Sequence, residues 1–214
     1  MSDDRHPCPL CGGPTEPFHS DRRRDYHRCP GCGLIHVPRS QQLDATGEKA
    51  EYDLHRNDPD DPGYRRFLER AAAAVRARVT PPAHGLDFGC GPGPTLSLML
   101  EDAGYSVALY DKYYAAHPGA LQQRYDFITA TEVFEHLGNP AAVLRRLLGC
   151  LHPGGWLVVM TKRARGDRAA FADWHYIHDP THVAFFSDAT FEWIAAKHGL
   201  RLEFVCDDVV ALQR

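Results

Sequence analysis

The chain has 214 residues, of which 43% are hydrophobic and 24% are charged, and this balance is ordinary for a soluble globular protein. Its length suits one α/β domain with a small additional module. The formal net charge of −4 gives the whole molecule no electrostatic attraction to nucleic acid, no apolar run approaches the roughly 20 residues of a membrane span, and the first four residues do not read as a signal peptide.

Two near-copies of a Cys-x-x-Cys-Gly unit stand near the start of the chain, at residues 8–12 and 29–33. Each unit lets two thiolates reach one ion, and its glycine permits the tight turn that aims backbone N–H groups at sulfur. The spacing between the units is that of a zinc ribbon, so we predict a structural zinc ion with four thiolate ligands, Cys8, Cys11, Cys29 and Cys32. A redox-active dithiol is the alternative. A metal pattern of this kind also predicts a reducing compartment, the cytoplasm.

The segment between the two units, residues 20–28, carries four arginines and one tyrosine. Such a basic segment can contact phosphates or stack on a base. The alternative is a solvated hairpin tip, in which Asp21 and Asp25 offset part of the charge. Residues 39–63 are polar and contain helix-breaking residues, which predicts a linker.

A helix is predicted to follow this linker. Asp61 suits its N-cap, and Pro62 suits its first turn. Apolar side chains then recur at helical spacing and mark one buried face: Tyr64, Phe67, Leu68, Ala71, Val75 and Val79. The Pro81-Pro82 pair ends the helix before the first strand of the main domain.

The central motif of the chain is a glycine loop. Residues 85–93 read Gly-Leu-Asp-Phe-Gly-Cys-Gly-Pro-Gly, and residues 95–103 have helical composition. A strand, a glycine loop and a helix in this order turn backbone N–H groups toward a ligand. The next strand ends on Asp111, whose carboxylate can accept hydrogen bonds from both ribose hydroxyls of a nucleoside. Together these features predict a nucleoside-type cofactor.

The charge before the loop narrows the choice of cofactor. Asp87 would repel a pyrophosphate, but it suits a ligand that bears an ammonium or a sulfonium group. A glycine turn without a ligand and a dinucleotide-dependent oxidoreductase are the alternatives.

At this point the chain resembles the class I S-adenosylmethionine-dependent methyltransferases, whose first motif has the form of Leu-Asp-Phe-Gly-Cys-Gly-Pro-Gly. Two later segments are also similar to that family. Residues 132–136 match its Glu-Val-x-Glu-His element, and residues 151–155 match the Leu-x-Pro-Gly-Gly element that precedes a buried strand. The resemblance implies an α/β fold, with a doubly wound, mostly parallel Rossmann-like sheet and a terminal antiparallel hairpin.

The resemblance also assigns roles to residues. It implies that S-adenosylmethionine (SAM) is held by Tyr64, Asp87, Gly89, Cys90, Gly91, Gly93, Asp111, Lys112, Thr131 and Glu132. Tyr52, His55 and Tyr64 are lid candidates, because the segment before the first strand often folds over the cofactor in this family; simple packing is the alternative for each. The expected organisation is a zinc ribbon at 1–40, a linker and lid at 41–62, and a methyltransferase domain at 63–214.

The segment after Asp111 is shorter than in typical relatives. Only residues 112–124 separate it from the next clear strand, at 125–130, where relatives fit a helix and a further strand. We expect residues 120–122 to form a vestigial strand. Farther on, the sequence predicts a helix capped by Asn139, and a last helix that begins after Ser187 and stops at Gly199.

The acceptor side is expected between residues 162 and 186. Residues 179–187 are similar to the Asp-Pro-Thr-His-Val-x-Phe-Phe-Ser element of some methyltransferases. Methyl transfer needs aligned reactants and, for many acceptors, removal of a proton, for which histidine is suited near neutral pH. We therefore predict His182, oriented by Asp179, and His136 as catalytic residues. The alternatives are a loop-shaping role and a second metal site formed by His175, His178, Asp179 and His182.

The function predicted from the sequence is SAM-dependent methyl transfer to a small-molecule acceptor. One alternative is an RNA methyltransferase that uses the ribbon to dock its substrate. The other is a non-catalytic interaction module that senses the cofactor and docks a partner through the ribbon.

Overall fold

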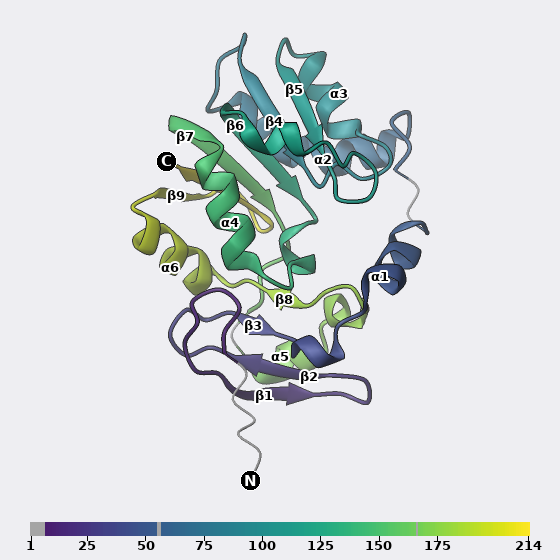
Figure 1. Cartoon of the computed structure of the whole chain (residues 1–214), viewed down its shortest axis with the longest axis vertical. Coiled ribbons are helices and arrows are strands. Elements are labelled where there is room, and N and C mark those ends of the chain that lie inside the picture. Colours follow the sequence, from purple (N-terminus) through teal and green to yellow (C-terminus); the bar gives the residue numbers. More distant parts are fainter. Residues whose placement is uncertain (1–6, 55–56, 166) are drawn as a thin grey trace.

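The computed structural model describes residues 7–54, 57–165 and 167–214. Its strands form two sheets, and the smaller sheet lies below the larger one in Figure 1. In spatial order the larger sheet consists of β5 (Ser106–Tyr110), β4 (His84–Phe88), β6 (Tyr125–Thr131), β7 (Leu151–Met160), β10 (Val209–Gln213) and β9 (Arg201–Phe204). The first four of these strands are parallel and β10 is antiparallel to both neighbours. This confirms the predicted sheet with its terminal hairpin.

Helices cover both faces of the larger sheet (Figure 1). One face packs against α4 (Pro140–Gly149) and α6 (Asp188–His198), and the other against α2 (Pro62–Arg76) and α3 (Thr95–Glu101). The reason lies in the two-residue period of a strand, because successive side chains point to opposite faces. In β7, Leu157 belongs to the core beneath α4 and α6, whereas Val158 belongs to the core beneath α2 and α3.

The predicted caps are present at the helix ends. The carboxylate of Asp61 accepts a hydrogen bond from the Gly63 N–H at 2.8 Å, at the start of α2. Ser187 Oγ accepts one from the Thr190 N–H at the start of α6, and Gly199 ends that helix with a φ of 65°. These short polar side chains satisfy backbone N–H groups that have no partner within the helix, so the sequence fixes where the helices begin.

The prediction of a vestigial strand at residues 120–122 is wrong. Pro118–Gln122 forms a short 3-10 helix, and β5 is the edge strand of the larger sheet. The Tyr125 hydroxyl donates to the Ala120 carbonyl at 2.7 Å, and Ala120 is buried. The carbonyl that a strand would have offered to β5 is therefore used inside the domain.

The predicted linker contains regular structure. A 3-10 turn at Arg39–Gln41 precedes α1 (Ala45–Tyr52), whose N-cap is Asp44. No residue of α1 is fully buried, and no apolar periodicity marks it. Its polar side chains instead contact the segment that follows β5, so the helix depends on tertiary contacts that composition does not show.

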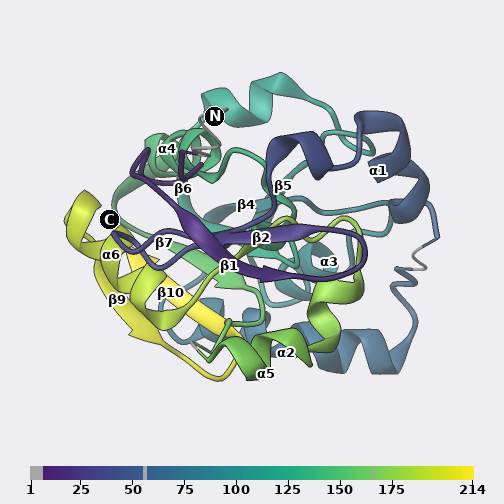
Figure 2. The same ribbon diagram turned by 90° about the horizontal axis from the view of Figure 1, so that it is seen from below.

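The smaller sheet pairs strands from the first 36 residues with a strand that lies much later in the sequence. Its strands, in spatial order, are β1 (Glu16–Ser20), β2 (Asp25–Arg28), β3 (Ile35–His36) and β8 (Ala184–Phe185), and neighbours are antiparallel. Viewed from below, β1 and β2 lie across the molecule in front of the larger sheet, with α1 and α5 (Arg168–Ala172) beside them (Figure 2). The ribbon strands therefore pair with a strand from the main part of the chain.

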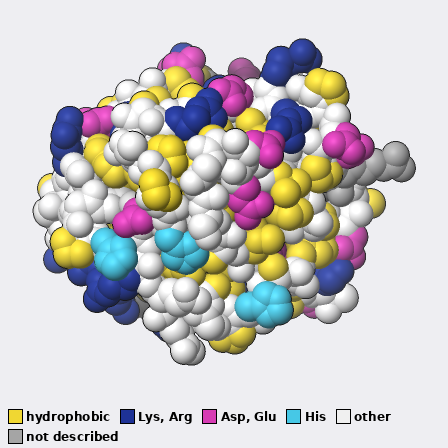
Figure 3. Space-filling view, turned by 90° about the horizontal axis from the view of Figure 1, so that it is seen from above, with side chains coloured by type: hydrophobic (Ala, Val, Ile, Leu, Met, Phe, Trp, Pro, Cys, Tyr) yellow, Lys and Arg dark blue, Asp and Glu magenta, His cyan; other side chains and the backbone are white. Residues whose placement is uncertain are grey.

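The face seen from above, away from the smaller sheet, shows acidic, basic and apolar side chains interspersed (Figure 3). Across residues 7–54, 57–165 and 167–214, no helix is both long and apolar enough to cross a membrane.

Candidate functional site

A cavity of about 760 Å³ lies at the carboxyl ends of β4, β5 and β6, where ligands bind in open α/β sheets. Because these strands are parallel, their ends meet at one edge of the sheet. The cavity wall includes every residue predicted to bind the cofactor or to act in catalysis: Tyr64, Asp87, Gly89, Cys90, Gly91, Gly93, Asp111, Lys112, Thr131, Glu132, His136, Asp179 and His182. Tyr52 lines it too, and His55 lies outside the described residues.

The loop requires glycine for two reasons: its backbone adopts positive φ angles, and neighbouring residues pack closely against it. Gly89 and Gly91 have φ values of 78° and 64°, a region that side chains disfavour. A Cβ on Gly89 would lie 2.3 Å from a methyl carbon of Val133, and a Cβ on Gly93 would lie 1.8 Å from the carbonyl oxygen of Asn57. Asn57 thus packs on the loop, which sequence reasoning missed because a single polar residue in a linker carries no signal.

Two carboxylates form the acidic end of the cavity. Asp87 is buried in β4 and accepts a hydrogen bond from Thr129 Oγ1 at 2.8 Å, across the β4–β6 pair. Burial raises its pKa to about 6; Thr129 opposes the shift, and the charge of Asp111 adds to it. Asp111 accepts the N–H groups of Gly91 and Tyr113 at 3.2 and 2.7 Å. This geometry concentrates negative charge at one end of the cavity. A cationic ligand would offset the effect of burial and of Asp111 on the ionised form of Asp87.

Helix α1 is held beside the cavity by one partly buried acidic residue, Glu48. Its Oε2 accepts from Lys112 Nζ at 2.5 Å and from the Tyr113 hydroxyl at 3.0 Å, and its Oε1 accepts from the Tyr52 hydroxyl at 2.8 Å. Burial opposes ionisation of Glu48, but the hydrogen bonds from Lys112 and Tyr52 outweigh it and lower the pKa of this carboxyl. Lys112 therefore contacts helix α1 in the described structure.

Two imidazoles lie together at the other end of the cavity. The ring centroids of His136 and His182 are 4.8 Å apart. His182 Nδ1 lies 2.8 Å from the Tyr176 carbonyl oxygen, so this nitrogen carries the hydrogen and Nε2 keeps its lone pair. His182 Nε2 lies 3.6 Å from an oxygen of Asp179. Burial, followed by the charge of His136, lowers the pKa of His182, so its ring is neutral near pH 7.

Two acidic residues of the segment after β6 lie behind these rings. Glu135 is fully buried and accepts hydrogen bonds from Thr161 Oγ1 at 2.9 Å and from the Tyr176 hydroxyl. Burial and then Glu135 raise the pKa of Glu132 to about 9. Among the described residues, Glu132 Oε1 has no hydrogen-bond partner. The Glu-Val-x-Glu-His resemblance could have indicated Glu135, but only its first and last residues were predicted as site residues.

The alternative metal site of four residues is wrong. His175 is exposed beside Lys162 Nζ at 2.9 Å, and His178 is exposed beside Arg23. The loop turns these rings away from His182. Within the described part of the chain, the grouping with metal-binding chemistry at this end is instead Glu135, His136 and His182, whose ligand atoms all lie within 4.8 Å of one another.

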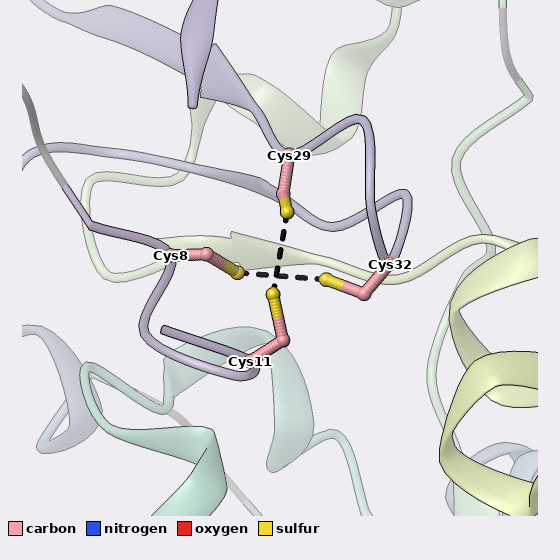
Figure 4. A group of neighbouring side chains, drawn as sticks. All are labelled: Cys8, Cys11, Cys29 and Cys32. Carbon is pink, nitrogen blue, oxygen red and sulfur yellow. Dashed lines mark hydrogen bonds between the residues drawn. The ribbon is translucent and has the colours of Figure 1, made fainter. Parts of the chain in front are cut away.

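The four cysteines of the two knuckles converge on one point (Figure 4). The Sγ atoms of Cys8 and Cys32 are 3.5 Å apart, and those of Cys11 and Cys29 are 3.4 Å apart. Ligands about 2.3 Å from a tetrahedral ion are separated by about 3.8 Å, so this set fits zinc. The contact between Cys8 and Cys32 lowers the pKa of the Cys8 thiol to about 5 and raises the pKa of the Cys32 thiol, as expected of two thiols that compete for one proton.

The glycines behave at the knuckles as the sequence predicts. Gly12 and Gly33 both have a φ of 75°, and the Gly13 N–H donates to Cys11 Sγ at 3.4 Å. The basic segment between the knuckles forms the tip of the β1–β2 hairpin, as one of the two predictions for it expects, but one of its arginines is not solvated. Arg22 and Arg23 are exposed, but Arg24 is buried, and its guanidinium is directed into the protein rather than toward solvent or a phosphate.

This is the fold of a class I SAM-dependent methyltransferase. It is defined by the six-stranded sheet, by the glycine loop that follows β4 and by Asp111, which follows β5. The chain belongs to the family described as "Methyltransferase domain", which matches residues 64–204. This confirms the resemblance seen in the sequence.

Curated relatives are ubiquinone biosynthesis O-methyltransferases. The one from Serratia proteamaculans is 34% identical over 95 residues, which are 44% of this chain and 38% of the relative. The one from Thiobacillus denitrificans is 29% identical over 151 residues, which are 64% of this chain and 61% of the relative. The chain thus spans less than two thirds of the length of these relatives.

Solved structures show the same fold at low identity. The 1,6-didemethyltoxoflavin-N1-methyltransferase of Burkholderia thailandensis, with 1,6-didemethyltoxoflavin and S-adenosylhomocysteine (SAH) bound, has a TM-score of 0.55 and 16% identity over 93% of this chain and 99% of that one. The magnesium protoporphyrin IX methyltransferase of Synechocystis PCC 6803, with SAH bound, has a TM-score of 0.53 and 13% identity over 79% of this chain and 95% of that one.

Proposed function

We propose that this protein transfers a methyl group from SAM to a small-molecule acceptor. The observation that carries the proposal is one cavity that joins the glycine loop and Asp111 at one end to His136 and His182 at the other. Its volume, about 760 Å³, lies within the range of small-molecule sites, about 300–1,000 Å³. The relatives named as ubiquinone O-methyltransferases, and the neighbour that holds didemethyltoxoflavin, support a small acceptor by analogy.

The acidic end would hold the cofactor. Asp87 faces a positive group of the ligand, Asp111 accepts from the ribose hydroxyls, and the glycines allow the backbone to approach. The donor set fits a cation, because burial and the charge of Asp111 both raise the energy of ionised Asp87, which a positive ligand would lower. When bound, SAM supplies an electrophilic methyl group on a sulfonium. The protein then has to align the acceptor with this methyl group and to remove a proton from the acceptor.

The histidine end would hold the acceptor. Tyr176 fixes the tautomer of His182, so that the Nε2 lone pair is available to take the acceptor's proton. Asp179 stabilises the imidazolium that results. Accepted hydrogen bonds from Thr181 help to keep Asp179 ionised, and its pKa is lowered although burial opposes ionisation. The four thiolates would hold a structural zinc ion, and their filled tetrahedron leaves no position for substrate. The division into a ribbon at 1–40, a lid at 41–62 and a domain at 63–214 is part of this proposal.

The cofactor assignment is tested by replacing Asp111 with asparagine and measuring SAH binding by calorimetry. The substitution keeps the side chain's shape and one accepting oxygen, but it removes the charge that strengthens both ribose hydrogen bonds, so we expect a loss of at least about tenfold in affinity. Asp102→Asn, an exposed position after α3, is the matched control. Unchanged binding by Asp111→Asn, with normal binding by the control, would refute the assignment.

The acceptor is identified by incubating the protein with methyl-labelled SAM and fractionated cell extract. We expect label in the small-molecule fraction, and His182→Ala should abolish most of it. Label in RNA would favour docking of nucleic acid through the ribbon. Binding of SAH without any transfer of label would favour a cofactor-sensing module.

A further inference from the structure

The ribbon reaches the histidine end of the cavity through one buried side chain. Arg24 lies in the turn between β1 and β2 and is 7% exposed. Its guanidinium donates four hydrogen bonds, all to backbone carbonyls of the loop before β8: to Ile177 at 2.7 Å, Asp179 at 2.9 Å, Pro180 at 2.9 Å and His182 at 3.0 Å. The loop is therefore wrapped around a single cation, and two of its four carbonyls belong to residues proposed to act on the acceptor.

The ribbon fixes the position of this guanidinium. Asp21 accepts the backbone N–H of Arg24 at 2.8 Å and the hydroxyl of Tyr26 at 3.0 Å. The Arg24 guanidinium carbon lies 5.5 Å from the Tyr26 ring centroid, a cation–π distance. Tyr26 is buried in β2, and Cys29 follows the end of that strand. The turn that presents Arg24 is thus continuous with the second zinc knuckle.

A second connection holds the other end of the same loop. Strand β3, which follows the second knuckle, pairs with β8, with Ile35 opposite Phe185. The Val37 N–H donates to the Val183 carbonyl at 2.9 Å, next to His182. His182 therefore lies between two points at which its loop is held by the ribbon, Arg24 on one side and strand β3 on the other.

We propose that Arg24 is a positioning residue for methyl transfer, and that the zinc-bound ribbon supports the loop that carries the acceptor end. The inference rests on the proposed function for its catalytic consequence. The physical reason is that the guanidinium satisfies four converging carbonyls at once, which a flexible or uncharged side chain cannot do. Loss of the guanidinium, or of the zinc that shapes β2 and β3, frees residues 177–182 and displaces His182. The cofactor end, built on β4 and β5, keeps its geometry.

The test compares Arg24→Gln and Arg24→Lys with Arg22→Gln, an exposed arginine in the same turn. Hydrogen–deuterium exchange of residues 174–186 is measured without ligand. We expect exchange at least about tenfold faster in Arg24→Gln and in wild-type protein stripped of zinc, an intermediate rate in Arg24→Lys, and wild-type behaviour in Arg22→Gln. Residues 106–110 of β5 should exchange at the wild-type rate in every variant.

Two further readouts separate positioning from general stability. The imidazole ¹⁵N signals of His182, assigned with His182→Gln, should shift in Arg24→Gln and not in Arg22→Gln. Labelled methyl transfer should fall at least about tenfold in Arg24→Gln, with SAH affinity within twofold of wild type. If Arg24→Gln does not fold, Arg24→Lys decides by the same measurements.

Wild-type exchange and wild-type His182 signals in a folded Arg24 variant would overturn the proposal. Failure of the proposed function is a separate result, because it appears as wild-type protein that does not bind SAH, whereas loop protection is measured in the absence of any ligand.

Discussion

The two sheets of this protein are stabilised in different ways. The larger has an apolar core on each face, because alternate residues of β7 and β10 point to opposite sides. The smaller has two strands of only two residues, and its described contacts are a cluster of four cysteines, the buried guanidinium of Arg24 and an aromatic cluster that includes Tyr26 and Phe185. A segment of about 40 residues seldom folds on apolar packing alone. From this difference we infer that the ribbon depends on the proposed metal and on the main domain together.

The largest expected effect is on the metal. Cys29→Ser should reduce bound zinc from one ion per chain to none. The apparent free energy with which a structural zinc ion binds a small domain, about 10–16 kcal/mol, is then lost. We expect the ribbon to lose protection in hydrogen exchange while the larger sheet keeps its circular dichroism. Cys206→Ser, an exposed cysteine outside the tetrahedron, should retain zinc. More than one ion per wild-type chain would point to the grouping of Glu135 with the two histidines.

A core substitution in the larger sheet should be indifferent to zinc. Met160 is fully buried in β7 on the face covered by α2 and α3, whose core, among the described residues, includes none of the ribbon, so Met160→Ala should lower the free energy of unfolding by about 2–5 kcal/mol in urea titrations. The loss should be similar in the Cys29→Ser background, because the residue's contribution comes from packing. Leu54→Ala, at a position 74% exposed, should change stability by less than about 0.5 kcal/mol. A loss that depends strongly on zinc would break the comparison.

A smaller effect concerns pH. The folded-state pKa of Asp87, about 6, exceeds its ordinary value of 3.8 because of burial. The carboxyl ionises at lower pH in the unfolded chain, so this residue reduces the stability of the ligand-free protein as the pH rises from about 4 to 6. A cationic ligand favours the ionised form, so SAM affinity should increase about tenfold between about pH 5 and 7.5. Calorimetry with Asp87→Asn should show no such increase; an equal increase would exclude Asp87 as the cause.

The smallest effect is expected where the two sheets meet. Ser187 caps α6, and its Oγ lies 3.2 Å from the position of a Cβ on Gly33, in the second knuckle. Ser187→Ala should lower the free energy of unfolding by about 1 kcal/mol, because the Thr190 N–H loses its side-chain acceptor and keeps only the Ser187 carbonyl. Ser187→Asn, which can still cap, should recover most of the loss. No difference between the two variants would show that the cap does not contribute.

Features that depend on neighbours in the sequence could be predicted. The caps at Asp61 and Ser187, the glycine loop and the cysteine pairs each follow from the chemistry of a few adjacent residues. The 3-10 helix at Pro118–Gln122 and the helix α1 could not be predicted, because both have contacts with residues far along the chain: Cys150 Sγ donates to the Leu121 carbonyl, and Lys112 donates to Glu48. Glu135 was within reach through its motif, but nothing in the sequence shows that Thr161 and Tyr176 surround it.

By itself, the sequence determined the class of this protein: the glycine turn, the two acidic strand ends and the paired cysteines require particular residues at fixed spacings. Only the tertiary structure decided which side chains meet at the cavity. Arg24 and His182 are separated by most of the chain, and their contact depends on how β3 pairs with β8. Caps, turns and ligand pairs depend on a few neighbouring residues, whereas a long-range contact depends on the packing of the whole chain.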